Sequence, residues 1–151
     1  MSADNTLIAG IDIGGTKIAV GVTDGTGKVL SQDRNESEAQ RGPVEMMADA
    51  VAMVRKCVRE AGESSGNPSF IGVACPGPLS QKRGLILDTP NMPGWEGYAI
   101  IDRLREDFPC AAVLENDANA AALGEALFGS GRGKRFVAYF TISTGVGGGF
   151  V

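Results

Sequence analysis

Two runs of strand-forming residues near the start of the chain are separated by only three residues, 14–16. The first run covers residues 6–13. In the second, residues 17–23, isoleucine and valine alternate with smaller residues. A break this short, with two adjacent glycines, favours an antiparallel hairpin. A turn rich in Asp and Gly follows at residues 23–28, and a third strand is expected over about residues 29–34. The chain therefore begins with a three-stranded antiparallel meander.

Helices and strands are expected to alternate after this meander. Apolar residues at helical spacing predict a helix that begins near Pro43 and ends near Gly62, because Pro suits the first turn and Gly the C-terminal cap. Two apolar runs, residues 70–78 and 111–117, predict buried strands, and the first ends in a Pro-Gly-Pro turn. A short helix is expected between them, where apolar residues recur at Ile101, Leu104 and Phe108.

The last part of the chain continues this alternation. An alanine-rich helix is expected over residues 118–129, a strand over 135–142 and a glycine-rich turn over 143–149. The resulting order, β-β-β-α-β-α-β-α-β, predicts an α/β domain with a mixed sheet and helices on its faces. Strand-like residues resume at Phe150, and the sequence ends after two of them, at Val151. We therefore expect the chain to be part of a longer protein.

Charge and composition exclude several classes of function. The chain has 18 acidic and 14 basic residues and no long basic run, which disfavours a nucleic-acid partner. No stretch has the length of about 18 apolar residues that a membrane span needs, and no secretory signal is visible. The three cysteines are far apart in the sequence, which favours free thiols in a reducing compartment. A cytoplasmic protein is therefore expected. Histidine is absent, which excludes histidine catalysis and histidine-ligated metal within this chain.

The break between the first two strands carries a charged and hydroxyl-bearing motif, Asp12-Ile13-Gly14-Gly15-Thr16-Lys17. Two glycines leave backbone N–H groups accessible. With the hydroxyl and the ammonium group they form an anion cradle suited to phosphate. A carboxylate at Asp12 is suited to Mg²⁺ beside such phosphates. The alternative is that the glycines only make the hairpin turn, which leaves the flanking residues without a role.

A carboxylate, an amide and a carboxylate follow the second buried run, at Glu115-Asn116-Asp117. Open α/β sheets place their ligand sites at the carboxyl ends of such strands. Asp117 is suited to accept a proton from an attacking hydroxyl group, and Asn116 to bind neighbouring hydroxyl groups. The alternative is that Asp117 caps the following helix, and taken alone the motif favours capping. The two roles are compatible, because a helix N-terminus favours the ionised carboxylate.

Three loops are weaker candidates for ligand contacts. The run Thr144–Gly149 holds more glycine than a hairpin turn needs, so its amides are suited to a phosphate or a sugar. The rigid segments Pro76–Pro78 and Asn91–Trp95 follow strands, where they are suited to line a small-molecule pocket. The alternatives are a plain glycine turn and a Trp95 that only covers core surface.

Together these motifs resemble the ROK family (repressors, open reading frames, sugar kinases) of the actin/hexokinase-like ATPase superfamily. The resemblance rests on DIGGTK, ENDANAAALGE and TISTGVGGG, with CPGP and NMPGW in the expected places between them. It spans the chain from about Leu7 to Val151, and the order and spacing of the motifs make it specific. One departure is Ser143, where a glycine is usual.

The resemblance implies a ribonuclease H-like fold and a two-lobed kinase, of which residues 1–151 would be the N-terminal lobe. Family members continue for about as much chain again. That C-terminal lobe carries further sugar ligands, most of the adenosine pocket and a Cys-rich zinc motif. Zinc is therefore expected only in that lobe. The present chain alone is expected to bind nucleotide weakly and to phosphorylate little or no sugar. The oligomeric state of the complete protein stays open, and a homo-oligomer is among the alternatives.

The resemblance also assigns roles by position. Asp117 is implied as the general base and Asp12 as the residue near Mg²⁺. The residues implied to contact the ATP phosphates are Gly14, Gly15, Thr16 and Lys17, with Thr144 and Gly145. The residues implied to contact the sugar are Gly77, Asn91, Asn116 and Gly147.

The function implied is ATP-dependent phosphorylation of a hexose. Glucose is favoured because NMPGW resembles glucokinase-type members, while N-acetylmannosamine, N-acetylglucosamine and fructose stay open. One alternative is a sugar-responsive transcriptional regulator of the same family. Such regulators usually carry an N-terminal winged-helix domain and often a damaged phosphate motif, whereas the motif from Asp12 to Lys17 is intact. A second alternative is a non-catalytic actin-like ATPase lobe, against which the END motif argues.

Overall fold

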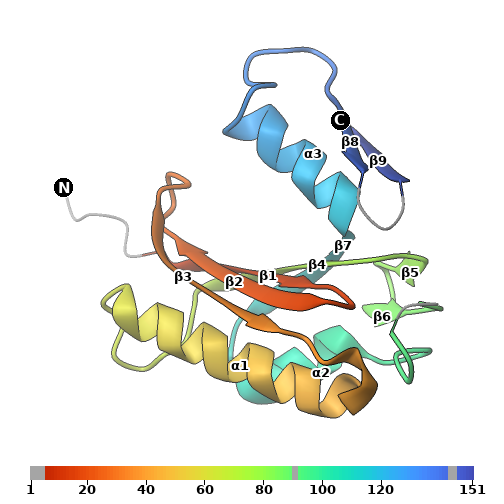
Figure 1. Cartoon of the computed structure of the whole chain (residues 1–151). Helices are drawn as coiled ribbons and strands as arrows, with labels where there is room; N and C mark the ends of the chain where they lie inside the picture. Colours follow the sequence, from red (N-terminus) through yellow and green to blue (C-terminus); the bar gives the residue numbers. More distant parts are fainter. Residues whose placement is uncertain (1–5, 90–91, 143–145) are drawn as a thin grey trace.

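The structure is a computed structural model that describes residues 6–89, 92–142 and 146–151. Its centre is a five-stranded sheet in the order β3-β2-β1-β4-β7 (Figure 1). The strands are β1 (Ile8–Ile13), β2 (Lys17–Thr23), β3 (Val29–Glu36), β4 (Phe70–Cys75) and β7 (Ala111–Asn116). The first three pair antiparallel, whereas β4 pairs parallel with both β1 and β7. The expected meander followed by parallel strands is confirmed.

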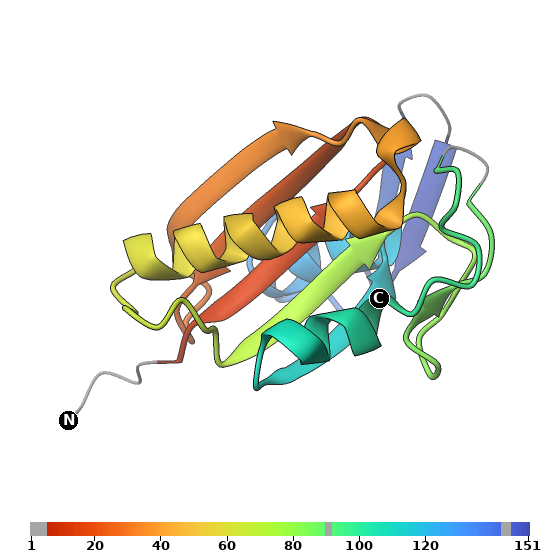
Figure 2. The same ribbon diagram turned by 90° about the horizontal axis from the view of Figure 1, so that it is seen from below.

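Two helices cover one face of this sheet. Helix α1 (Pro43–Glu60) crosses the meander and α2 (Ile100–Asp107) lies beneath β4 and β7, as Figure 2 shows. The core lies between these helices and the sheet, because β1, β2 and β4 alternate in burial and turn their apolar residues to this side. Pro43 stands at the start of α1, as its fixed φ predicts. No helix in the described part of the chain is long and apolar enough to cross a membrane.

Helix α3 (Asp117–Leu127) lies on the opposite face, together with a hairpin of β8 (Ala138–Ile142) and β9 (Val146–Phe150) (Figure 1). Below it the sheet has a row of glycines, because Gly10 pairs with Gly21 on one side and with Gly72 on the other. A Cβ atom at Gly21 or Gly72 would meet nothing within 4 Å. This face of the sheet therefore carries no side chains along the row of glycines and is open there.

The glycine-rich segment differs from the expected turn, because Val146–Phe150 forms strand β9 and pairs antiparallel with β8. A Cβ atom on Gly149 would overlap the carbonyl group of Ala118, so β9 passes close to α3 where only glycine fits. The glycines therefore allow a close backbone approach while keeping their strand hydrogen bonds. Strand β8 also starts at Ala138, three residues later than the expected residue 135.

The two strands expected to be buried differ in their surroundings. Strand β4 is central and alternates between buried and half-buried residues, but β7 is the edge strand and only Leu114 is buried in it. Val113 of β7 faces the open side of the sheet and is 51% exposed. Apolar character therefore predicted the strand but not its place in the sheet, which depends on which strand pairs with it.

The segment between β4 and α2 is more ordered than the sequence indicates. It contains a short hairpin of β5 (Leu79–Ser80) and β6 (Leu85–Ile86). In an earlier part of the chain, a single turn of 3₁₀ helix, η1 (Ala39–Arg41), precedes α1. Trp95 is fully buried in the core, as the structural alternative for that residue predicted.

Glycine substitutions test the contrast between the open sheet face and the packed core. Gly72→Ala should raise the free energy of unfolding by about 0.5–1 kcal/mol, because glycine costs entropy inside a strand and the added methyl group meets open space. Gly84→Ala should lower it by at least about 1 kcal/mol, because Gly84 has a φ of 64° and its Cβ would lie 2.7 Å from Cβ of Ile101. Urea denaturation of the two variants measures both values. Equal effects would contradict the described packing.

Candidate active site

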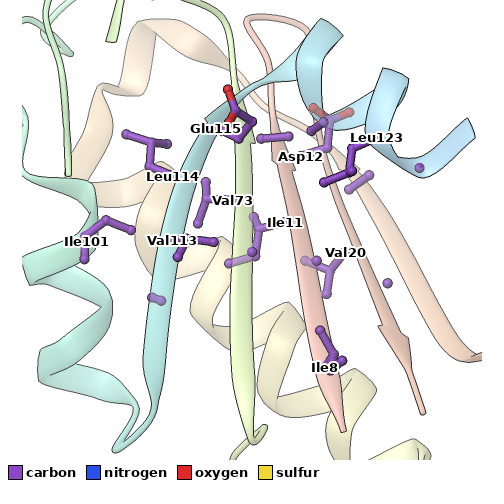
Figure 3. Close-up of a pocket in the computed structure, with 18 of the residues that line it drawn as sticks. Ile8, Ile11, Asp12, Val20, Val73, Ile101, Val113, Leu114, Glu115 and Leu123 are labelled. Carbon is purple, nitrogen blue, oxygen red and sulfur yellow. The ribbon is translucent and has the colours of Figure 1, made fainter. Parts of the chain in front are cut away.

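The carboxyl ends of β1, β4 and β7 lie side by side and carry the polar residues of the candidate site. Asp12 of β1 pairs with Ala74 of β4, and Ala74 pairs in turn with Glu115 of β7. Figure 3 shows the carboxylates of Asp12 and Glu115 at the same end of the sheet. Parallel pairing thus brings together two motifs that are about a hundred positions apart in the sequence.

The turn between β1 and β2 is held by two backbone hydrogen bonds. The N–H of Gly14 donates to the carbonyl of Lys17 at 2.9 Å, and the carbonyl of Thr16 accepts from the N–H of Ser37 at 3.0 Å. The side chains of Thr16 and Lys17 are exposed. The N–H of Gly14 is thus engaged inside the turn, so an anion cradle here would use the neighbouring amides, the Thr16 hydroxyl and the Lys17 ammonium group.

The junction of β7 and α3 differs in one respect from the sequence prediction, because Asn116 caps the helix and Asp117 does not. Oδ1 of Asn116 accepts from the N–H groups of Ala118 at 3.1 Å and Asn119 at 3.3 Å. Asp117 is the first residue of α3, and its Oδ1 accepts from the N–H of Ala118 at 2.8 Å. Its Oδ2 has no hydrogen-bond partner in the described residues, so this oxygen can receive a proton.

Two carboxylates influence each other at this end of the sheet. The pKa of Asp12 lies above its ordinary value although the side chain remains accessible to solvent. Desolvation by the surrounding protein is the largest cause, and the negative charge of Asp117 adds to it, while Lys17 and Arg34 act in the opposite direction. A cation placed beside Asp12 would relieve this cost.

Cys75 lies at the end of β4 and senses the same charges. Burial, followed by the charges of Asp117 and Asp12, raises the pKa of its thiol to about 12. The thiol therefore stays protonated at neutral pH and acts as a small apolar residue beneath the site, as expected of a buried cysteine.

Two of the weaker candidates from the sequence lie beside the β7–α3 junction. A Cβ atom on Gly77 would stand 3.5 Å from Nδ2 of Asn116, and one on Gly147 would stand 3.7 Å from Cβ of Ala118. Both glycines therefore border the residues around Asp117. Asn91, Thr144 and Gly145 lie outside the described residues.

Asp12 is the carboxylate beside the β1–β2 turn that could contact a metal ion. Mg²⁺ is usually bound by one or two carboxylates together with substrate phosphates and water, whereas other ions need a larger set of protein ligands. No group of three Cys, Asp or Glu residues that could hold a metal occurs within residues 6–89, 92–142 and 146–151. The carboxylate of Asp12, beside the exposed side chains of Thr16 and Lys17, is the group here that could hold hydrated Mg²⁺ together with a bound phosphate.

A hollow of about 1300 Å³ lies between the glycine-rich sheet face and α3. Its walls are mainly apolar and include Val113 and Leu123, and Asp12 and Glu115 stand at its polar end (Figure 3). Lys17 and Asp117 do not line it. The hollow therefore adjoins the candidate site and shares only its edge.

The sequence motifs missed one residue that acts on the site. Arg34 of β3 pairs with Ala19 of β2, which pairs in turn with Asp12. Its charge is near enough to lower the pKa of Asp12. Only the strand register places this arginine there, and no local pattern around Arg34 indicates it.

Comparison with known proteins gives a family match and related kinases. The model of the ROK family matches residues 8–151. A glucokinase of Thermotoga maritima is 32% identical over 144 residues, which cover 95% of this chain and 44% of that protein. The chain thus spans less than half the length of this relative.

Solved structures agree with the same fold. The crystal structure of a ROK hexokinase from Thermus thermophilus has a TM-score of 0.85 and 38% identity, covering 97% of this chain and 47% of that one. A ROK family glucokinase from Streptomyces griseus, in complex with glucose and AMPPNP, has a TM-score of 0.81 and 36% identity, covering 96% and 44%. The expected ribonuclease H-like fold of actin and hexokinase-type ATPases is confirmed.

The interaction between the two carboxylates predicts how the pKa of Asp12 responds to substitution. Asp117→Asn should lower this pKa, because it removes a negative charge that disfavours ionisation, and Lys17→Met should raise it. Carboxyl ¹³C chemical shifts followed against pH measure both changes. Asp102→Asn on the far side of the sheet is the matched control and should leave the pKa unchanged.

The same shift sets the sign of a stability change with pH. Between the ordinary pKa of 3.8 and the raised value, the folded chain keeps a proton that the unfolded chain has released. Stability from this group is therefore lost as pH rises through that window. If the pKa of Asp12 did not change in Asp117→Asn, the charge of Asp117 would not act on Asp12, and the described site would be contradicted.

Proposed function

This chain belongs to the ROK family, and from that membership we propose that it is the N-terminal lobe of a sugar kinase. The complete protein would transfer the γ-phosphoryl group of ATP to a hydroxyl group of a hexose. The observation that carries this proposal is the parallel pairing that sets Asp12 and the β7–α3 junction at one end of the sheet. A phosphate turn and a proton acceptor are the two parts that such a transfer needs from this lobe.

Asp117 is the proposed general base. The hydroxyl oxygen of the sugar attacks the γ-phosphorus, its proton passes to Oδ2 of Asp117, and ADP leaves with the electron pair of the broken P–O bond. The hydrogen bond from the N–H of Ala118 holds the other carboxylate oxygen, Oδ1. Its place in the first turn of α3 sets the carboxylate at the positive end of the helix dipole.

The turn from Gly14 to Lys17 is the proposed phosphate contact. Its exposed Thr16 and Lys17 side chains would bind phosphate oxygens, with Thr144 and Gly145 as further contacts. Asp12 would hold the Mg²⁺ that neutralises charge on those oxygens. Phosphoryl transfer depends mainly on such positioning and charge stabilisation.

The proposed sugar contacts surround Asp117. Oδ1 of Asn116 caps α3, so the Nδ2 group is the part of this residue that can donate to a sugar hydroxyl. Gly77, Gly147 and Asn91 would complete this side of the pocket. Glucose is the favoured substrate, which the glucokinase from Thermotoga maritima and the glucose-bound structure from Streptomyces griseus support.

Substitution of the proposed base tests the reaction. In the complete protein that carries this chain, Asp117→Asn should lower kcat for sugar-dependent ADP release by about 10²–10⁴-fold, because the amide cannot accept the proton. The assay uses MgATP with glucose, N-acetylglucosamine, N-acetylmannosamine and fructose in turn. Asp102→Asn, an exposed aspartate of α2, is the matched control and should retain full activity. If the unsubstituted complete protein instead bound sugar without turnover, the result would favour a sugar-responsive regulator.

Substitution of the turn lysine tests the phosphate contact. Lys17→Met should raise the KM for ATP about tenfold or more and change the KM for sugar little, since it removes a charge-assisted hydrogen bond to phosphate. Lys28→Met is the matched control, because Lys28 is an exposed lysine beside the other turn of the meander. A change in both KM values, or in neither, would remove Lys17 from the phosphate site.

A further inference from the structure

Glu115 has no part in the transfer described above, yet its carboxylate accepts three hydrogen bonds. Oε1 accepts from the backbone N–H of Asn116 at 2.8 Å and from Nδ2 of Asn119 at 3.1 Å. Oε2 accepts from Nε2 of Gln81. An ionised carboxylate only accepts hydrogen bonds, so the three donors suit it.

These bonds join three segments of the chain. Glu115 belongs to the end of β7, Asn119 to the first turn of α3 and Gln81 to the hairpin of β5 and β6. Asn116 and Asp117 lie in sequence between Glu115 and Asn119. Their backbone is therefore fixed from both sides. On the strand side, Glu115 accepts from the N–H of Asn116, and on the helix side, Asn119 donates to the same carboxylate.

The hairpin of β5 and β6 leads to the proposed sugar contacts. It begins two residues after Gly77, and the carbonyl of Pro78 accepts from the N–H groups of Leu87 at 3.0 Å and Asp88 at 3.3 Å. The N–H of Gly97 donates to the carbonyl of Ile86 at 2.8 Å. The hairpin thus precedes the segment that leads in sequence to Asn91, and Gln81 donates the hydrogen bond that joins the hairpin to the β7–α3 junction.

We propose that Glu115 is a positioning residue that fixes the general base Asp117 relative to the β5–β6 hairpin. This inference rests on the proposed function. Glu115 acts through geometry: its carboxylate orients the α3 junction with one oxygen and the β5–β6 hairpin with the other. A displacement of about 1 Å at a reacting group lowers a rate by about 10²-fold, so such a brace affects catalysis without contacting the reacting atoms.

Four substitutions separate positioning from charge. Glu115→Ala should lower kcat by about 10²-fold, because all three hydrogen bonds are lost. Glu115→Gln should stay within about threefold of the original kcat, because its amide oxygen still accepts two bonds and its NH₂ group donates to Gln81 once that amide rotates. Asn119→Ala should lower kcat, whereas Gln81→Ala should mainly raise the KM for sugar. Glu125→Ala, at the far end of α3, is the matched control.

The pair of Glu115 variants decides the role in the reaction. If Glu115→Gln were as inactive as Glu115→Ala, the negative charge would be the essential feature, and the positioning role would be overturned. Equal changes in kcat and KM in every variant would also overturn it, because they would not distinguish the junction from the hairpin.

Amide hydrogen exchange tests the brace independently of activity. Glu115→Ala should increase exchange about tenfold or more in the β5–β6 hairpin and in the first turn of α3 together, with α1 unchanged. Unchanged exchange in the two segments would overturn the inference, and so would an equal increase in α1, which would indicate a loss of global stability. If the original protein phosphorylates no sugar, the proposed function fails, while this measurement still decides whether Glu115 couples the two segments.

Discussion

The parallel pairing of β4 with β1 on one side and with β7 on the other determines where the candidate site can form. This register sets Asp12, Ala74 and Glu115 in one row across three strands, and it brings the turn between β1 and β2 to the same edge as the start of α3. A slip by one residue would turn every side chain of a strand to the other face. The apolar residues that β1 and β4 turn towards α1 and α2 prevent this slip, so the core of the domain also fixes the geometry of the site.

The two faces of the sheet serve different purposes. One face holds the core under α1 and α2, where large apolar side chains are packed. The other has glycines in register at Gly21, Gly10 and Gly72, with a hollow between them and α3. Glycine weakens a strand, so a row of three on one face costs stability without adding packing in this chain. That face therefore contributes little to the core, and it leaves the polar end of the sheet accessible.

The charges at the strand ends lower the stability of the fold and also suit the proposed reaction. Desolvation and the negative charge of Asp117 disfavour the charge of Asp12, while Lys17 and Arg34 offset part of this cost. A protein that needed only stability would not place two carboxylates there. The cost is consistent with a site that receives a cation and a proton during the proposed transfer, because each would relieve it. Cys75 stays a neutral thiol beneath them and adds no charge.

Local pattern determined much of this protein from the sequence alone. Alternation and the Gly-Gly break predicted the meander and helical spacing predicted α1 and α2, because each depends on neighbours within a few positions. The motifs at Asp12 and Asp117 in the same way indicated candidate site residues, whose roles stay predictions. Only the tertiary structure decided that β7 is an edge strand and that Val146–Phe150 is a strand packed against α3. The same holds for the capping of α3 by Asn116, for the effect of the Arg34 charge on Asp12 and for the hydrogen bond between Gln81 and Glu115. These features depend on which distant segments pair and how closely their backbones approach, and no local spacing in the sequence contains that information.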